Sequence, residues 1–397
     1  MSQADKRRRA TSRRVSASAF GKRGINVKKA ELRQTPLHER HLALGGKIVP
    51  FAGYELPVHY IGAIAEYLAV RKKAGLFDTS FKGKLLLSGP DATRNLQNLL
   101  TNDFSDMPVG GVRYSTMCND AGGIVDDLVV YRHASDSYLL VVNATNREKD
   151  TSWIRSHLCG RVRFEDCSDG IAVLAIHGPT SERILGKLGD ARQLPADRSA
   201  FEHDVKVAGI CARISRSNNA GEAGFEMHVE NRDAETLWDA LLDAGTDYGL
   251  IPAGLGARGA LHFEAGIPLY GHELADDITP LEAGLDFVVK MNKRDFIGKR
   301  ALLEHGKPRR RRVGLRMAGQ GIAYGHDEVF FGERAIGTTT SAAHCPYLGA
   351  SFAMALLEVG FTPPGTQVEV AARGRRAAAE VVPMPFYKRR RGKRSSA

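Results

Sequence analysis

The order of apolar and polar residues predicts a series of short helices and strands. In residues 61–75, Ile61, Ile64 and Leu68 recur at helical spacing, and Gly75 stands where a helix would end. We therefore expect a helix here. The same reasoning predicts three more helices, which lie after Pro90, near residues 180–188 and around residues 237–242.

Apolar runs bounded by Gly, Pro or charged residues predict strands between these helices. They cover residues 84–89, 124–131, 138–142, 172–178, 210–215 and 225–229. After about residue 280 the helical signals fade, and shorter strand-like runs follow at residues 313–317, 328–331, 335–340, 368–372 and 379–384. This order is typical of an α+β region with antiparallel sheets, followed by a small barrel or sandwich.

Two adjacent acids interrupt the predicted strand 124–131. Side chains alternate along a strand, so Asp127 shares one face with Val129 and Tyr131, whereas Asp126 points to the other face. Both faces are otherwise apolar. A carboxylate that faces a packed surface is costly unless it is hydrogen-bonded, paired or placed in a cleft, so at least one of the two acids needs an explanation.

The composition describes a large folded protein with basic ends. The 397 residues, of which 43% are hydrophobic, suffice for two or three domains, and no apolar run long enough to span a bilayer is present. The net charge of +11 comes from residues 1–34 and 388–397, which we expect to be solvated tails, while the chain between them is acidic overall. We therefore expect neither a membrane nor a nucleic acid as partner.

The cysteines and the N-terminus bear on the compartment. The 5 cysteines are scattered and form no C-x-x-C pair, which argues against disulfides and zinc and favours a reducing interior. We expect a cytoplasmic protein. The Arg- and Ser-rich N-terminus is also typical of an organelle transit peptide, so the mitochondrial matrix stays open as an alternative.

Some local patterns identify no function by themselves. GLGARG at 254–259 matches a dinucleotide-binding fingerprint, but Pro252 breaks the strand that should precede it. His38 and His41 have no clustered third ligand, which favours a surface helix or turn over a zinc site. Taken alone, Glu226 could be a solvent-facing strand residue and Arg258 a member of a surface ion pair.

Many segments together resemble the tetrahydrofolate-dependent aminomethyltransferases, the T-proteins of the glycine cleavage system. The resemblance runs from Thr35 to about Tyr387 and follows the order of the family. Its most specific segments are TPLHERH, FAGYELPVHY, AVRKKAGLFDTS, TNDF, YSTMCNDAGGIVDDLVVYR, VVNATNREKD, IHGP, GEAGFE, GLGAR, EAGIPLYGHEL, FIGKRAL, YLG and MPFY.

The resemblance implies a fold and a division of the chain. The fold is α+β, with two interwoven α+β subdomains of ferredoxin-like antiparallel sheets and a C-terminal β-barrel around a central folate-binding hole. The expected division is a basic tail at 1–34, the folate-binding region at 35–279, the barrel at 280–387 and a second basic tail at 388–397.

The resemblance also implies the site residues. Asp127, the second acid of GGIVDDL, matches the family's acid that addresses the folate nitrogen, which leaves Asp126 with a local role in a turn or surface hydrogen bond. The positions that line the family's folate pocket are matched by Tyr114, Tyr131, Asn143, Glu226 and Arg258.

The chemistry of the reaction agrees with these assignments. A pterin ring presents its 2-amino group and N3–H as adjacent donors, which the carboxylate of Glu226 can accept, while Arg258 supplies a fixed positive charge. The N5 amine of tetrahydrofolate attacks a methylene carbon held between nitrogen and sulfur. A carboxylate beside N5, such as Asp127, can stabilise the developing charge and accept a proton. We expect tetrahydrofolate as co-substrate and no metal.

The family's donor is an aminomethyl group on the lipoyl arm of an H-protein. The implied function is transfer of its methylene group to tetrahydrofolate, with release of ammonia, in glycine cleavage. H-proteins are typically acidic, so the basic run KPRRRR at 307–312 is expected to steer their approach. The sequence gives no prediction of the oligomeric state.

Several positions around the expected pocket depart from the family's usual residues, while the folate-facing positions match. Two alternatives therefore stay open, a tetrahydrofolate-dependent demethylase of a small methylated amine, sulfonium or aryl ether, and a non-catalytic folate-binding module. The departures are Phe81 for His, Lys82 for Met, Asn219 for Tyr, Ala220 for Thr, Gly259 for an acid and Phe287 for Trp.

Overall fold

A computed structural model of the chain describes residues 32–319 and 321–389. The predictions for residues 1–31 and 390–397 lie outside this part of the chain. Arg33, which we expected in the basic tail, forms a parallel β-bridge with Tyr54, and its N–H donates to the carbonyl of Gly53 at 2.9 Å. Among the described residues, no helix is both long and apolar enough to cross a membrane.

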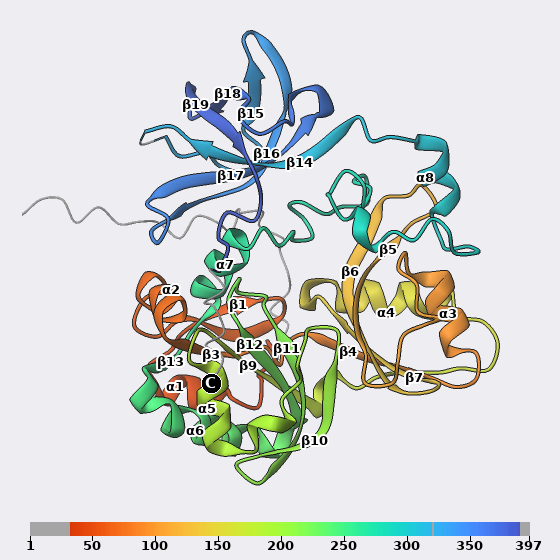
Figure 1. The fold of residues 1–397 in the computed structure, drawn as a ribbon, viewed down its shortest axis with the longest axis vertical. Coiled ribbons are helices and arrows are strands. Elements are labelled where there is room, and N and C mark those ends of the chain that lie inside the picture. The colour runs from red at the N-terminus through yellow and green to blue at the C-terminus, as the bar shows by residue number, and fades with distance from the viewer. Residues whose placement is uncertain (1–31, 320, 390–397) are drawn as a thin grey trace, which may run out of the picture. The chain divides into compact units, whose positions relative to one another are not determined.

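The first large sheet has six strands, in the order β10-β11-β12-β9-β3-β13. Its strands confirm those predicted at 172–178, 210–215 and 225–229, and they are mostly antiparallel, with only β13 parallel to β3. Strand β3 is separated from its neighbour β9 by almost a hundred residues of chain, which form another sheet. In Figure 1 the red-orange β3 accordingly lies among green strands. The bounds are β3 Ala74–Asp78, β9 Ile171–His177, β10 Phe201–Val207, β11 Ile210–Ser217, β12 Gly224–Glu230 and β13 Leu250–Pro252.

The second sheet consists of the five strands inserted between β3 and β9, in the order β5-β6-β7-β4-β8. All of its pairs are antiparallel, which confirms the predicted mixture of helices with antiparallel sheets. Because the inserted sheet returns the chain to the first one, the two α+β units are interwoven. The bounds are β4 Gly83–Ser88, β5 Val112–Cys118, β6 Ile124–Ala134, β7 Ser137–Val142 and β8 Arg163–Asp166, and a separate hairpin holds β1 Lys47–Phe51 and β2 Tyr54–His59.

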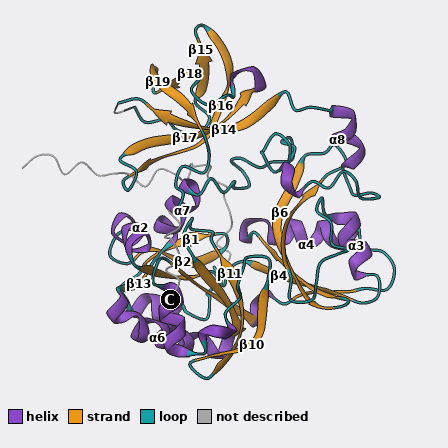
Figure 2. Ribbon diagram, in the orientation of Figure 1, coloured by secondary structure: helices purple, strands orange, loops and turns teal. Residues whose placement is uncertain are grey.

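Helices lie against the sheets, as the purple and orange ribbons of Figure 2 show. Leu237, Trp238 and Leu241 of α6 pack with Ile184 and Leu185 of α5 in the core of the six-stranded sheet. The predicted helices are confirmed. The helices are α1 His38–Ala43, α2 Ala63–Lys72, α3 Ala92–Leu99, α4 Arg147–Ser156, α5 Ser181–Leu188, α6 Ala234–Gly245, α7 Leu255–Glu264 and α8 Lys299–His305.

Helix α2 forms where it was predicted, and its buried face includes an acid. Ile61 and Ile64 are 70% and 53% exposed, whereas Glu66 is fully buried. The Glu66 carboxylate accepts hydrogen bonds from the N–H groups of residues 60, 61 and 62 before the helix and of Gly254 beside it. These bonds remove the cost of its burial and fix the rotation of the helix. Gly75 does not end the helix, because it lies in β3.

His38 and His41 of α1 are buried, so the prediction of a surface helix or turn was wrong. His41 is completely buried, with Nε2 3.0 Å from Asp78 Oδ2 and Nδ1 2.9 Å from the Tyr60 hydroxyl. Burial is tolerated because both ring nitrogens have partners. These contacts tie α1 to the end of β3.

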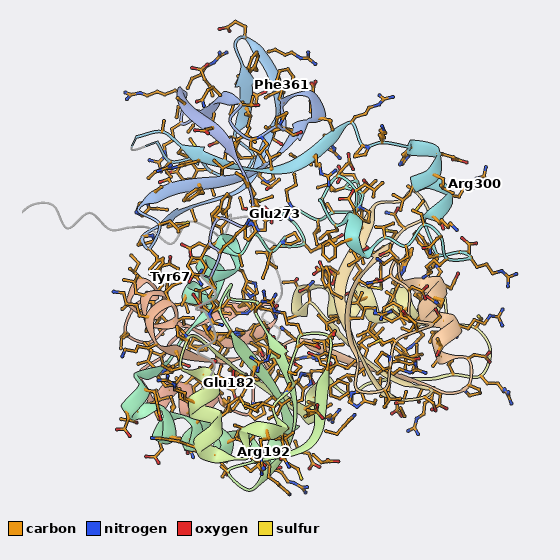
Figure 3. The ribbon with its side chains drawn as sticks, in the orientation of Figure 1. Tyr67, Glu182, Arg192, Glu273, Arg300 and Phe361 are labelled. Atoms are coloured by element: carbon orange, nitrogen blue, oxygen red, sulfur yellow. The ribbon has the colours of Figure 1, made fainter. Side chains whose placement is uncertain are left out.

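The C-terminal strands close into a barrel, in the order β14-β17-β16-β15-β18-β19. The sequence predicted a small barrel or a sandwich, and the structure has the barrel. Strand β17 was not predicted. Glu273, which Figure 3 labels below the barrel, accepts hydrogen bonds at 2.6 Å from Thr340 and Ser341 of β16 and so joins the barrel to the segment before it. The bounds are β14 Arg310–Met317, β15 Glu328–Phe331, β16 Arg334–Cys345, β17 Ala350–Glu358, β18 Gln367–Ala372 and β19 Arg375–Val382.

Candidate functional site

The two adjacent acids lie at the start of β6, directly after a tight glycine turn. Ile124 donates its N–H toward the carbonyls of Ala275 and Ile278, so the turn is held against the segment that leads to the barrel. A Cβ atom at Gly123 would lie only 1.7 Å from the carbonyl oxygen of Asp276, which no other residue could accommodate. The turn thus fixes where β6 begins and which way each acid points.

Asp127 is half-buried and is held by two neighbouring strands. Asn143, the residue after β7, places its Nδ2 2.9 Å from Asp127 Oδ1 and 3.0 Å from Asp126 Oδ1. The Tyr114 hydroxyl of β5 also hydrogen-bonds to Asp127. The structure therefore brings together three of the predicted site residues around one carboxyl group.

The surroundings of Asp127 shift its protonation toward neutral pH. Burial raises the pKa of this carboxyl, and the charge of Asp126 raises it further, whereas the hydrogen bonds from Tyr114 and Asn143 lower it. The outcome is a pKa of about 7. A carboxyl group with such a pKa can both accept and return a proton near neutral pH, as a general base requires.

Asp126 does not have the turn or surface role that we expected. It is completely buried, and it faces Asp150 of α4, which is also completely buried. Burial, followed by the hydrogen bond and charge of Asp126, raises the pKa of Asp150 to about 11. Asp150 is therefore protonated at neutral pH and donates to Asp126, so that this pair holds one negative charge beneath Asp127.

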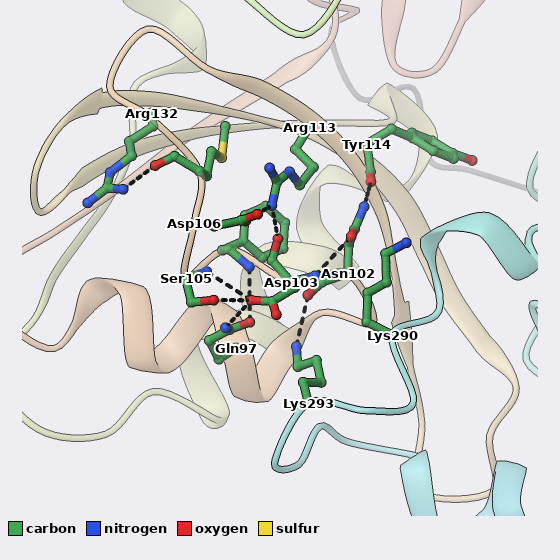
Figure 4. Close-up of polar contacts among 12 residues, drawn as sticks. Gln97, Asn102, Asp103, Ser105, Asp106, Arg113, Tyr114, Arg132, Lys290 and Lys293 are labelled. Atoms are coloured by element: carbon green, nitrogen blue, oxygen red, sulfur yellow. Dashed lines mark hydrogen bonds and ion pairs between the residues drawn. The ribbon is translucent and has the colours of Figure 1, made fainter.

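The TNDF segment holds the strand that carries Tyr114. Asn102 donates its Nδ2 to the carbonyl of Tyr114 at 2.8 Å, and the buried Lys293 donates to the carbonyl of Asn102 at 2.9 Å (Figure 4). The Tyr114 ring stacks on Phe287, with ring centroids 6.3 Å apart. Phe287, which was noted in the sequence only as a departure from Trp, therefore packs against Tyr114, the residue whose hydroxyl hydrogen-bonds to Asp127.

A second group of predicted residues gathers around Glu226 of β12. Its carboxylate accepts from Asn219 Nδ2 at 2.8 Å and lies 3.4 Å from Lys82 Nζ. Burial would raise the pKa of Glu226, but the charges of Lys82, the neighbouring histidines and Arg258 lower it to about 2. Glu226 is therefore an ionised acceptor at neutral pH and not the solvent-facing residue of the simplest interpretation, since only 5% of it is exposed.

Arg258 lies in the same pocket as Glu226. It is in the first turn of α7, and together with Phe77, His177 and Asn219 it lines the pocket. Its half-buried guanidinium forms no hydrogen bond or ion pair with any residue in 32–319 or 321–389, and its nearest ring contact is Phe81 at 5.8 Å. A half-buried guanidinium without an internal partner is suited to bind a polar or anionic ligand.

Tyr131 connects the strands that carry the two groups. It lies on the same face of β6 as Asp127, and its hydroxyl is 3.2 Å from Ser215 Oγ of β11. Ser215 is the register partner of Glu226. Tyr131 itself packs on Phe201 in a sheet-to-sheet contact and has 5% exposure, so it positions the two groups more than it lines an open pocket.

Sequence reasoning missed the site roles of Lys82, Asn219 and Arg312. Arg312 of β14 is close enough for its charge to act on Tyr114, and its guanidinium donates to the carbonyls of Ala283 and Gly266. The departures from the family's usual residues at Lys82 and Asn219 could have indicated a role in the site, because both residues contact Glu226. Arg312 stood in a basic run that we had interpreted only as surface charge.

Two family models match this chain in sequence. The model of the GCVT N-terminal domain matches residues 37–293, and the model of the glycine cleavage T-protein C-terminal barrel domain matches residues 310–388. Together they span both sheets and the barrel, including every residue described above as part of the site.

Individual relatives agree with these family models. An aminomethyltransferase of Bacillus cereus is 45% identical over 362 residues, covering 90% of this chain and 99% of the relative. One from Caldanaerobacter subterraneus is 46% identical over 361 residues, covering 90% and 96%. The crystal structure of the glycine cleavage system aminomethyltransferase T from Bartonella henselae has a TM-score of 0.82 and 31% identity, covering 90% of this chain and 99% of that one.

Proposed function

The chain belongs to the glycine cleavage T-protein family and is an aminomethyltransferase, and on that premise we propose that Asp127 serves the accepting amine of tetrahydrofolate in this reaction. The donor in this proposal is an aminomethyl group on the lipoyl arm of an H-protein. The methylene carbon passes to tetrahydrofolate, and ammonia leaves. The relatives' names and the coverage of both chains favour this function over a demethylase or a non-catalytic folate-binding module.

The observation that carries the proposal is the environment of Asp127. A carboxyl group whose pKa is raised to about 7 by burial and by Asp126 retains the ability to take up a proton at neutral pH. Tyr114 and Asn143 fix its orientation, so no reorganisation is needed when charge develops beside it. Asp127 would stabilise the positive charge that forms on the attacking amine and then accept its proton.

The residues around Glu226 support tetrahydrofolate as the acceptor. The ionised carboxylate suits the adjacent 2-amino and N3–H donors of a pterin, and the unpartnered Arg258 suits a polar or anionic part of the same molecule. Tetrahydrofolate supplies the nucleophilic secondary amine when it is bound. Tyr131 links β6 to β11, so the acid that would act and the acid that would bind are held by one contact between sheets.

The test is Asp127→Asn with aminomethyl-lipoyl H-protein and tetrahydrofolate as substrates. Asparagine keeps the shape and the bonds to its neighbours but cannot accept a proton, so we expect kcat to fall by about 10²–10⁴-fold. Tetrahydrofolate affinity, measured by calorimetry, should change by no more than a few-fold. Ammonia release and methylenetetrahydrofolate formation give the rate.

The matched control is Asp120→Asn, an exposed acid in the turn just before Asp127. It removes the same charge from the same segment and should leave kcat unchanged. A near-normal kcat for Asp127→Asn would contradict the proposed role, and a loss of tetrahydrofolate binding without a loss of kcat at saturation would assign Asp127 to binding instead.

A further inference from the structure

The ammonium group of Lys82 lies beside the carboxylate of Glu226, which lines the candidate pterin pocket. Its Nζ is 3.4 Å from Glu226 Oε1, and the two side chains are 15% and 6% exposed. The turn after β3 places it there, where the Lys82 N–H donates to the carbonyl of Thr79 at 3.2 Å. The ion pair is therefore largely shielded from water, which strengthens it relative to a surface pair.

Two departures from the family's usual residues meet at one oxygen atom. Asn219 stands where the family commonly has Tyr, and its Nδ2 donates to Glu226 Oε1 at 2.8 Å; Lys82 stands where the family commonly has Met. The Ser217 hydroxyl is a third donor to Oε1, at 3.5 Å. No described residue donates to Oε2, so the second oxygen is left for a ligand.

The Lys82 ammonium has donor capacity left over. It carries three N–H groups, and Glu226 is its only hydrogen-bond acceptor within residues 32–319 and 321–389. Its charge also acts on His177 and His262, which line the same pocket. The anionic acceptor that lines the pocket thus has a cationic donor beside it.

This arrangement is complementary to one edge of a 4-oxopteridine. That edge carries a 2-amino donor, an N3–H donor and a 4-oxo acceptor in a row. The free Oε2 of Glu226 can accept from these donors, and the ammonium beside the carboxylate can donate to the 4-oxo group. A 4-aminopteridine presents a donor at position 4 instead, which an ammonium would repel and leave unpaired.

We propose that Lys82 is a specificity-determining residue that makes this chain select 4-oxopteridines over 4-aminopteridines. The inference rests on the proposed use of tetrahydrofolate, and it goes further by assigning a role to a residue that the family does not commonly have at this position.

The experiment is calorimetric titration of the full chain with tetrahydrofolate and with its 4-amino-4-deoxy analogue. We expect the unsubstituted protein to bind tetrahydrofolate more tightly, and Lys82→Met to reduce that preference by about tenfold, because it removes one charge-assisted hydrogen bond and one repulsion. Lys82→Arg, which keeps the charge, should retain most of the preference. Lys187→Met is the matched control, since Lys187 is also ion-paired, to Asp247, but lies on α5.

If Lys82→Met proves unfolded by circular dichroism, Lys82→Gln removes the charge with a polar side chain, and the same reduction is expected. An unchanged preference in the neutral variants would overturn the role of Lys82 alone, because tetrahydrofolate binding would persist. If the unsubstituted protein bound neither ligand, the use of tetrahydrofolate itself would be overturned, and this inference with it.

Discussion

The paired carboxyls of Asp126 and Asp150 are the least expected residues of the site. Both are fully buried, and both Asp150 oxygens lack a hydrogen-bond partner unless one acid of the pair is protonated. A shared proton removes one charge from the interior and satisfies both groups. The remaining charge raises the pKa of Asp127, so the pair contributes to the property on which the proposed mechanism depends.

A pH-dependent stability follows from the raised pKa of Asp150. The folded-state pKa, about 11, lies above the unfolded value near 4, so the stabilising contribution of the protonated group is complete below about pH 4 and is lost as pH rises. Asp150→Asn keeps the donor to Asp126 but cannot ionise. The difference in unfolding free energy between this variant and the unsubstituted protein should therefore grow with pH. We expect it to increase in favour of the variant by at least about 1 kcal/mol from pH 6 to pH 8.

Urea unfolding at pH 6 and at pH 8 measures this difference. The exposed Asp120→Asn variant provides the baseline, since its effect should not change over the same pH range. A difference for Asp150→Asn that stayed constant or shrank with rising pH would mean that Asp150 is ionised in the folded protein.

At the residue scale, the sequence predicted the acids but not their surroundings. The three residues that the structure gathers at the first carboxyl, Asp127, Tyr114 and Asn143, were all predicted by resemblance, and so were Glu226 and Arg258. The position of Asp126 was mispredicted because its partner Asp150 lies on a helix whose packing no local pattern reveals. Likewise, Lys82 and Glu226 are 144 positions apart, so their contact is visible only in the fold.

At the scale of elements, apolar runs predicted strands that are buried on both faces, such as β9 and β12, but β17 was missed. Strand β17 is buried along nearly its whole length. Ala353, Ala355 and Leu357 face the barrel interior, whereas Phe352 and Met354 pack outside it against Phe263 and other residues. A short apolar run cannot be told from a buried helix by its period, and this one holds Ala, Met and Leu but no β-branched residue, which explains why the strand was not predicted.

Helix α2 gives an element-level prediction, because the polar contacts of Glu66 hold it in place together with the apolar contacts of Tyr67 and Val70. Glu66→Ala would remove the acceptor of four backbone N–H groups, one buried and three partly buried, and we expect a loss of about 2–3 kcal/mol in unfolding free energy. Ile64→Ala on the same helix should change it by less than about 0.5 kcal/mol, because Ile64 is 53% exposed. Denaturant unfolding monitored by far-UV circular dichroism compares the two. A larger effect for Ile64→Ala than for Glu66→Ala would contradict the stabilising role of the Glu66 contacts.

At the scale of the whole molecule, most of the basic run at 307–312 is engaged within the fold. Arg310 pairs with Glu282 at 2.7 Å, Arg311 pairs with Asp286 at 2.6 Å, and Arg312 donates to backbone carbonyls. Lys307 and Arg309 are exposed. The predicted steering of an acidic H-protein therefore depends on these two residues more than on the run as a whole.

The double variant Lys307→Ser/Arg309→Ser tests this steering. We expect association with H-protein to slow by a few-fold at low salt and its salt dependence to flatten, because long-range attraction between opposite charges is screened by ions. Surface plasmon resonance at low and high salt provides both values. Arg183→Ser/Lys187→Ser on α5 removes equal charge elsewhere and should have little effect. If both double variants slowed association equally, the net charge of the protein, and not the position of Lys307 and Arg309, would be the cause.

The interwoven path of the chain has a consequence for its synthesis. Strand β3 leaves the ribosome before the whole five-stranded sheet, yet its neighbours β9 and β13 emerge only after that sheet is complete. The inserted sheet is continuous in sequence and can assemble early, whereas β3 must wait with both edges unsatisfied until the nascent chain has passed residue 252. During translation β3 is thus the segment most exposed to wrong pairing, and chaperone capture at this stage would protect it.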